Sequence, residues 1–296
     1  MPSASSRSAR TPTIRVGVHV SIAGSIALAV TRAAEAGCNT FQIFSRNPRG
    51  WGYRDLSIED AAQFREALSN SGISPVFDHM PYLPNLATPR EEIYEKSCAA
   101  LTAELLRCGT LGIPFLVTHL GHHLGEGIGG GKTRVIRAVN LALGAAPNGV
   151  MLLLENTAGE KNGVGSTFED IREVMDGIEF PERTGVCFDT CHAYGAGYDL
   201  RTPEGLGETL DRLDEVIGHA HVRLIHLNDS KGDLGSGLDR HVHIGLGSIG
   251  EEAFAHMLQL DFFRKRPLIC ETPVDGRRDD RGNIRKVWEL AGAEGD

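Results

Sequence analysis

Short apolar runs alternate with longer segments of helical spacing along almost the whole chain, and this alternation limits the folds that the chain can adopt. Continuous apolar strands followed by helices indicate a parallel sheet covered on both faces. Eight such units fit the usual size of a (β/α)8 TIM barrel, and an open doubly wound sheet is the competing α/β architecture. We expect strands at residues 14–20, 40–45, 74–79, 113–120, 149–156, 184–192, 222–229 and 267–272. We expect helices at residues 24–36, 57–71, 89–110, 132–145, 166–177, 203–218, 249–259 and 282–292, with Ser57 and Ser166 as N-caps.

The 296 residues contain no linker or change of composition that would divide them, so we expect a single TIM-barrel domain over residues 14–296. Residues 1–13 are polar, lack the apolar stretch of a secretory signal and are expected to form a flexible tail. A basic arm that contacts a polyanion is the alternative for this segment. No run reaches the roughly 18 apolar residues that a membrane helix needs, so we expect a cytoplasmic protein without membrane contact.

Six of the expected strands end in a residue that can bind a metal ion. Buried strands usually end in turn residues, and in a TIM barrel all C-terminal strand ends meet at the face where active sites form. A further cluster, Asp239-Arg240-His241, is expected in a loop. We therefore expect a polynuclear metal site built from residues far apart in the sequence. The candidate ligands are His79, His119, Glu155, Asp189, His192, His226, Asp239, His241 and Glu271.

These candidates comprise five imidazoles and four carboxylates, a set that suits zinc, manganese or iron. Nine ligands exceed what one tetrahedral ion uses and fit two or three ions that share a carboxylate. Three divalent ions would outweigh four carboxylates and leave a positive pocket for an anionic substrate such as phosphate. A single histidine after an apolar run is more often structural. Glu155 and Glu271 differ, because glutamate is very rarely buried without a partner.

Other features exclude several functions. The net charge of −9 argues against a general nucleic-acid coat protein. The six cysteines form no CxxC pair, and Cys187, Cys191 and Cys270 are expected to be buried structural thiols. GEGIGG and GLGSIG match GxGxxG, but neither has the strand–helix context of a dinucleotide site, so we reject nucleotide binding. His19 ends the first expected strand and is expected to support the ligands from outside the set.

Two long segments, FDTCHAYGAGYD and HLNDSKGDLGSGLDRH, resemble the endonuclease IV family of apurinic/apyrimidinic endonucleases. Shorter matches are GVHVSIAGS, FSRNPRGW, HMPYLPNLA, THLGHHLGEG, LLLENTAG and LICETP. The resemblance extends from about Gly17 to about Trp288 and implies a (β/α)8 barrel with three zinc ions, manganese being an alternative at some positions. Every ligand position of the family is filled in this chain. The resemblance assigns His79, His119 and Glu155 to one ion, Glu155, Asp189, His226 and Glu271 to the second, and His192, Asp239 and His241 to the third.

The resemblance also implies DNA contacts. Arg49 and Tyr82 stand where the family inserts side chains into DNA at the damaged site, and phosphate pairing and base stacking suit these two residue types. Gly50 and Leu246 depart from the family pattern, which bears on details of DNA contact and not on the metal ligands.

The implied activity is hydrolysis of the phosphodiester bond 5′ to an abasic site in double-stranded DNA, giving a 3′-hydroxyl and a 5′-deoxyribose phosphate, with 3′-end trimming as a further activity. Glu155 would be catalytic, as the bridge between two ions and the acceptor of a proton from water. We expect a monomer. A metal-dependent TIM-barrel sugar isomerase or epimerase is the alternative, although it would leave the third ligand group without a role. A non-catalytic protein that binds damaged DNA is disfavoured because no ligand is missing.

Overall fold

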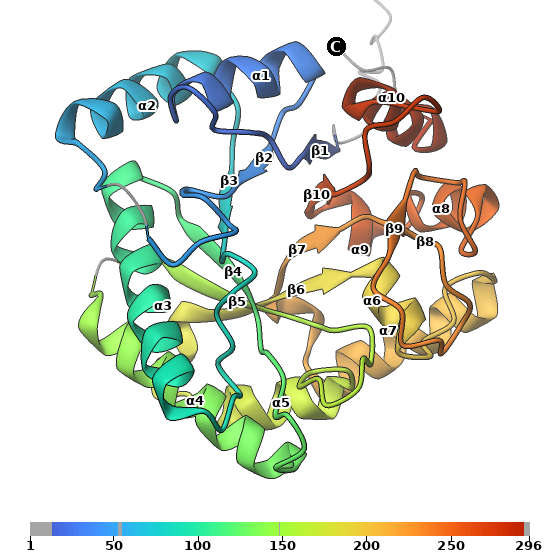
Figure 1. Ribbon diagram of the computed structural model, residues 1–296. Coiled ribbons are helices and arrows are strands. Elements are labelled where there is room, and N and C mark those ends of the chain that lie inside the picture. Colours follow the sequence, from blue (N-terminus) through green and yellow to red (C-terminus); the bar gives the residue numbers. More distant parts are fainter. Residues whose placement is uncertain (1–13, 53–54, 148, 293–296) are drawn as a thin grey trace, which may run out of the picture.

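Eight parallel strands form one sheet at the centre of the molecule, and helices surround it as an outer ring (Figure 1). Neighbouring strands follow the order β1-β10-β7-β6-β5-β4-β3-β2. A bridge between His19, just beyond β1, and Gln42 in β2 joins the two outermost strands of this order and closes the barrel. The expected TIM barrel is therefore confirmed. The barrel strands are β1 (Arg15–Val18), β2 (Phe41–Ile43), β3 (Val76–His79), β4 (Phe115–His119), β5 (Met151–Glu155), β6 (Thr184–Asp189), β7 (Val222–His226) and β10 (Pro267–Cys270).

The structure, a computed structural model, describes residues 14–52, 55–147 and 149–292. The expected N-terminal tail, residues 1–13, and the last four residues of the expected domain lie outside this part of the chain. Within it, no helix is both long and apolar enough to span a bilayer. The helices are α1 (Leu28–Ala36), α2 (Ile58–Ser71), α3 (Glu91–Leu111), α4 (Ile128–Ala145), α5 (Phe168–Asp176), α6 (Thr190–Gly195), α7 (Pro203–Val216), α8 (Glu251–Met257), α9 (Asp261–Arg264) and α10 (Asp280–Leu290).

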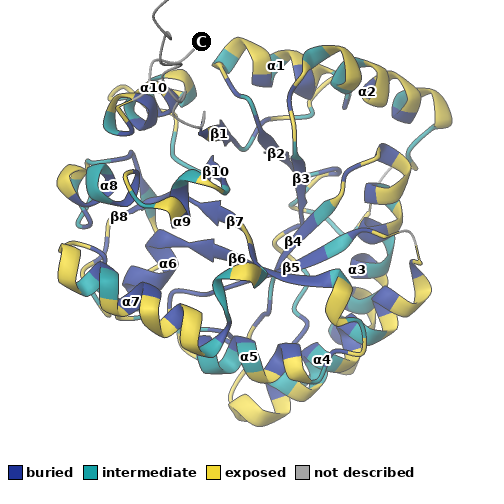
Figure 2. Ribbon diagram, turned by 180° about the vertical axis from the view of Figure 1, so that it is seen from behind, coloured by how far each residue is buried: buried dark blue, intermediate teal, exposed yellow. Residues whose placement is uncertain are grey.

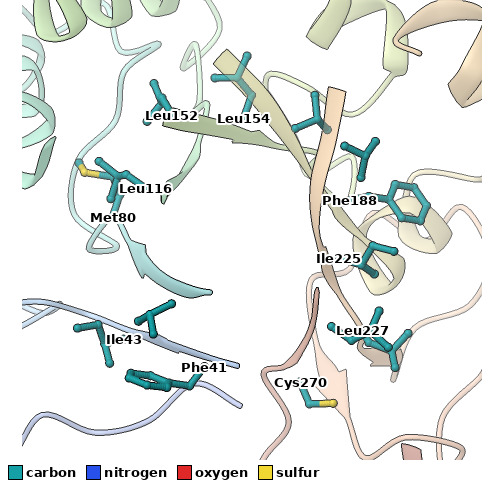
Figure 3. Packing of buried hydrophobic residues seen from close by; sticks show 14 of the residues in the cluster. Phe41, Ile43, Met80, Leu116, Leu152, Leu154, Phe188, Ile225, Leu227 and Cys270 are labelled. Atoms are coloured by element: carbon teal, nitrogen blue, oxygen red, sulfur yellow. The ribbon is translucent and has the colours of Figure 1, made fainter. Parts of the chain in front are cut away.

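Strand side chains alternate between the interior of the barrel and the layer beneath the helices. The interior layer is a separate cluster of buried residues contributed by six of the strands. Leu152 and Leu154 belong to the larger outer cluster, which Figure 3 shows around the strands. Figure 2 shows the consequence, since the strands are buried while the helices expose their outer faces. The interior cluster consists of Phe77, Val117, Leu153, Cys187, Leu224 and Ile269.

All eight strands are shorter than expected, and two of them end three residues early. The strand expected to reach residue 192 ends at Asp189, because this side chain accepts a hydrogen bond from the backbone N–H of His192 at 2.7 Å and caps helix α6. The strand expected to reach residue 229 ends at His226. Beyond it, β8 (Asp229–Ser230) pairs antiparallel with β9 (His241–Val242), outside the barrel sheet. His241 therefore lies in a strand and not in the expected loop.

Helix boundaries differ from expectation at several places. Ser57 caps α2 as expected, accepting from the Asp60 N–H at 2.9 Å. The cap of α5 is Thr167, so the prediction of Ser166 was wrong by one residue. Helix α1 begins later than expected, after Gly24 with its left-handed φ of 86°, and α4 begins earlier. The helix expected at residues 249–259 corresponds to the shorter α8, and α9, which follows it, was not predicted.

Candidate metal centre

The interior layer of the barrel carries six of the nine candidate ligands to its C-terminal mouth. Because side chains alternate along a strand, a residue two positions beyond an interior residue faces the same side. Each of the six follows an interior core residue at this spacing, so the ligands form the next layer above the core. The pairs are Phe77 and His79, Val117 and His119, Leu153 and Glu155, Cys187 and Asp189, Leu224 and His226, and Ile269 and Glu271.

The remaining three candidates come from outside the barrel strands. His192 lies in the first turn of α6, Asp239 precedes β9, and His241 begins β9. The structure brings all nine candidates together in three groups, within each of which the ligand atoms lie within 4.8 Å of one another. The groups are His79, His119 and Glu155; Glu155, Asp189, His226 and Glu271; and His192, Asp239 and His241.

Glu155 is shared by two of these groups. Its Oε2 lies 3.1 Å from His79 Nε2 and 3.0 Å from His119 Nε2, whereas its Oε1 lies 2.9 Å from His226 Nδ1. The carboxylate is fully buried. One oxygen therefore faces each group, which is the arrangement a bridging carboxylate needs.

Asp189 connects the second group to the third. Its Oδ2 lies 3.8 Å from His226 Nδ1 and 3.7 Å from His241 Nε2. In the third group, Asp239 Oδ1 lies 3.2 Å from His192 Nε2 and 3.4 Å from His241 Nε2. The three groups thus form one continuous cluster.

Hydrogen bonds fix which nitrogen of the imidazoles faces the cluster. In three of them Nδ1 lies against a backbone carbonyl, which accepts only from a protonated nitrogen, so Nε2 is left to bind a metal. The carbonyls belong to Met80 for His79 (2.7 Å), Asn156 for His192 (2.9 Å) and Glu271 for His241 (3.2 Å).

His226 is oriented by a side chain, Gln42, that the sequence analysis missed. The buried Gln42 accepts from His226 Nε2 through Oε1 at 2.9 Å and donates through Nε2 to Glu271 Oε1 at 2.7 Å. Its Nε2 also lies 3.0 Å from His19 Nδ1, so His19 lies behind the candidate ligands, where the sequence placed it. The signal for Gln42 was a polar residue in the middle of an apolar strand, FQI, on the interior side.

The charge of the cluster suits metal cations. Burial alone would raise the pKa of Glu155, but the imidazoles of His119 and His226 hold this pKa well below its ordinary value. Burial opposes protonation of His192, yet the nearby carboxylates of Asp189 and Asp239 raise its pKa well above the usual range. His192 Nε2 and His241 Nε2 are buried without a hydrogen-bond partner among the described residues. Carboxylates that attract positive charge and unpartnered imidazole nitrogens fit bound divalent ions.

Two thiols lie close to the cluster but do not suit the ligand role. Cys187 is within reach of Glu155 and His226, and Cys191 is within reach of Asp189 and His241. Burial raises the pKa of each thiol to about 12, which favours the protonated form over the thiolate that binds metal. Both are unpaired and buried, in agreement with the structural role expected for them.

Aromatic rings extend from the cluster to the surface of the mouth. Phe44 lies 5.6 Å from the His79 ring and 5.0 Å from the Tyr82 ring, measured between centroids. Tyr82 is 68% exposed at the rim of a pocket of about 490 Å³ that six of the candidate ligands line. Arg49 is exposed on the loop after β2 and lies near enough to lower the pKa of Tyr82 by its charge, although burial dominates and raises that pKa.

Comparisons with known proteins identify the family of the chain. Residues 30–290 match the family described as xylose isomerase-like TIM barrels. A protein of Methanoculleus marisnigri named probable endonuclease 4 is 63% identical over 281 residues, covering 95% of this chain and all of that protein. The crystal structure of endonuclease IV from Thermus thermophilus has a TM-score of 0.84 at 37% identity, covering 94% of this chain and 99% of that chain.

The chain belongs to the endonuclease IV family of nucleases. A D-tagatose 3-epimerase-like protein is also similar in structure, with a TM-score of 0.69 over 94% of this chain, but at 19% identity it shares only the fold. The resemblance found in the sequence is therefore confirmed, and the sugar isomerase alternative retains support from the fold alone.

Proposed function

We propose that this endonuclease IV family member hydrolyses the phosphodiester bond 5′ to an abasic site in double-stranded DNA, leaving a 3′-hydroxyl and a 5′-deoxyribose phosphate, and that it also trims blocked 3′ ends. The observation that supports this most is Glu155, whose two oxygens face two separate ligand groups in a cluster with a third group beside it. Such a cluster suits a phosphodiester because several cations can balance the charge of one phosphate.

The nine candidates would hold three zinc ions, divided as the three groups are divided. Bound zinc supplies a water of lowered pKa and polarises phosphoryl oxygens. Glu155 would act as the catalytic bridge and as the acceptor of a proton from water, and its lowered pKa keeps the carboxylate ionised. Gln42 would keep the Nδ1 of His226 and the carboxylate of Glu271 aimed at the same position.

The pocket favours an extruded abasic sugar. The ligands lie at the mouth of a barrel whose interior below them is filled by the core, so a nucleotide within the duplex must leave the helix to reach them. Extrusion is cheapest where the base is already missing. Arg49 would contact phosphate and Tyr82 would stack in the gap left behind. We further propose that the protein acts as a monomer, in the cytoplasm, with the catalytic domain beginning at residue 14.

A duplex carrying one tetrahydrofuran abasic analogue tests the function. We expect incision on the 5′ side of the analogue, loss of incision after chelation, and recovery on addition of zinc. Mapping the product ends identifies the bond that is cut. Metal analysis of the purified protein then separates the alternatives, because three ions per chain support the nuclease and one or two support a sugar isomerase.

A further inference from the structure

A second cluster of buried charge lies between β3 and α3, outside the three ligand groups. We call it the loop clamp and define it as Ser45, Arg46, Asp78, Glu104 and Arg107. Glu104 and Asp78 are fully buried, and Arg46 is 5% exposed. Asp78 precedes the ligand His79 and points to the opposite side of β3, toward the helix. The mechanism proposed above does not use any of these five residues.

The loop clamp fixes the start of the β2–α2 loop through all three polar atoms of Ser45. The Ser45 N–H donates to Asp78 Oδ1 at 2.8 Å, and its Oγ donates to Glu104 Oε2 at 2.6 Å. Arg107 donates to Ser45 Oγ at 3.1 Å and to the Ser45 carbonyl at 2.5 Å. Glu104 also forms an ion pair with Arg46. One carboxylate on α3 therefore binds two consecutive residues of the loop.

The same short segment carries the exposed Arg49. Between the clamp and Arg49 the chain makes a tight turn, in which the Arg49 N–H donates to Asn47 Oδ1 at 3.1 Å. On the other side of Ser45, Phe44 packs 5.0 Å from Tyr82 and 4.2 Å from His19. The clamp thus holds the loop between an arginine at the surface and an aromatic residue beside the metal centre.

Stability alone does not account for such a cluster. A buried ion pair repays little of its desolvation cost, and well-packed apolar residues are often as stabilising or more so. What Glu104 adds is direction, because its Oε2 accepts a hydrogen bond from the Ser45 hydroxyl, and such a bond requires the donor at a defined distance and angle. A loop that is ordered before it meets its ligand also avoids part of the entropy cost of binding.

We infer that Glu104 is a positioning residue that holds the β2–α2 loop ready to place Arg49 in DNA at the abasic site. This inference rests on the proposed function, because it assigns the loop a DNA target. Glu104 belongs to none of the three ligand groups, so a loss of incision that leaves the metal centre unchanged would pass through the loop.

The test compares E104Q with the native chain on two substrates. Bis(p-nitrophenyl) phosphate reports the metal centre without a duplex for the loop to bind. Losing a charge-assisted hydrogen bond should raise KM for the abasic duplex about tenfold relative to KM for the small diester.

A double-mutant cycle adds the decisive readout. R49A should weaken duplex binding about tenfold in the native background and less than about twofold in E104Q, because the misplaced loop has already lost that contact.

Controls keep the outcomes distinct. K132M removes another ion-paired cation, which joins α4 to Asp170 and Glu173 far along the chain from the loop. The activity of this variant on both substrates should equal that of the native chain. If E104Q does not fold, the double variant R46M/E104M replaces the pair by apolar side chains and is measured in the same way. Equal effects of R49A in both backgrounds would overturn the inference while the proposed function stands. Failure of the native chain to bind or cut the abasic duplex would overturn both.

Discussion

Glu104 and Glu155 are both fully buried carboxylates, yet they have opposite kinds of partner. Glu104 is neutralised by the guanidinium of Arg46, which keeps its proton at any physiological pH and cannot bind a metal. Glu155 is surrounded by the imidazoles of His79, His119 and His226, which can exchange a proton for a metal ion. The difference shows that burial of a carboxylate does not mark a metal site by itself. The partner decides between a fixed structural clamp and an exchangeable centre.

Removing each carboxylate charge gives the sharpest contrast. Glu155→Gln should lower abasic-site incision by at least about a thousandfold, because the carboxylate that would hold two of the ions and take up a proton from water is lost. Zinc bound per chain should fall as well, whereas E104Q should retain its zinc. Incision assays and metal analysis on both variants check this, with circular dichroism as the test of folding. Native-level incision by the Glu155 variant would remove this residue from the mechanism.

Changing the orientation of one imidazole should have an intermediate effect. Gln42→Leu removes the acceptor of His226 Nε2 and the donor to Glu271. Loss of such an outer partner typically weakens metal binding about 10–100-fold. Competition with a chromogenic zinc chelator measures it. Gln259→Leu, at an exposed glutamine that donates to the Leu290 carbonyl, is the matched control and should bind zinc like the native chain. Equal zinc affinity in the two variants would show that Gln42 does not orient the ligand.

Tyr82 lies outside both buried clusters, so its substitution should weaken DNA binding without changing the stability of the fold. Tyr82→Ala removes a ring that is 68% exposed, so the melting temperature should hardly change. Base–aromatic stacking contributes about 1–3 kcal/mol, so affinity for the abasic duplex should fall about tenfold or more. Fluorescence anisotropy with a labelled duplex measures this, and an unchanged affinity would place the DNA elsewhere.

The smallest predicted effect concerns pH. In the metal-free protein, burial opposes protonation, but the charges of Asp189 and Glu155 raise the pKa values of His192 and His119 above the ordinary 6.5. These groups stabilise the fold below the unfolded pKa, and that contribution is lost as pH rises through the higher folded pKa. Zinc binding has the opposite slope, because protons compete with the metal. The melting temperature of the chelated protein should fall by a few degrees between about pH 6 and pH 9, while the increase caused by zinc should grow. Parallel curves with and without zinc would contradict the assignment of these imidazoles as ligands.

The sequence was sufficient to predict the barrel and to predict that the candidate ligands lie close together. The candidates could be recognised because each of six strands ends in a residue whose chemistry does not suit a simple turn. The sequence placed His192 wrongly in a strand, since an apolar run that continues through a capping Asp189 into a helix reads like one longer strand. It also missed Gln42 and Glu104, whose partners are distant in the chain. Glu104 had a detectable signal, because it shares the helical spacing of the buried Leu101 and Cys108 on α3. What it pairs with was not readable, since only the fold brings Arg46 within reach.

The two-residue spacing between core residue and candidate ligand keeps both side chains on the interior side of each strand. The same strand register that places Leu153 in the core places Glu155 at the centre, and a shift of one residue exchanges the two faces of a strand. A single inserted or deleted residue between Phe77 and His79 would therefore turn an imidazole toward the helices and an apolar side chain toward the substrate. Helices and loops of this barrel can change length and keep the chemistry, whereas the strand ends can change only in steps of two.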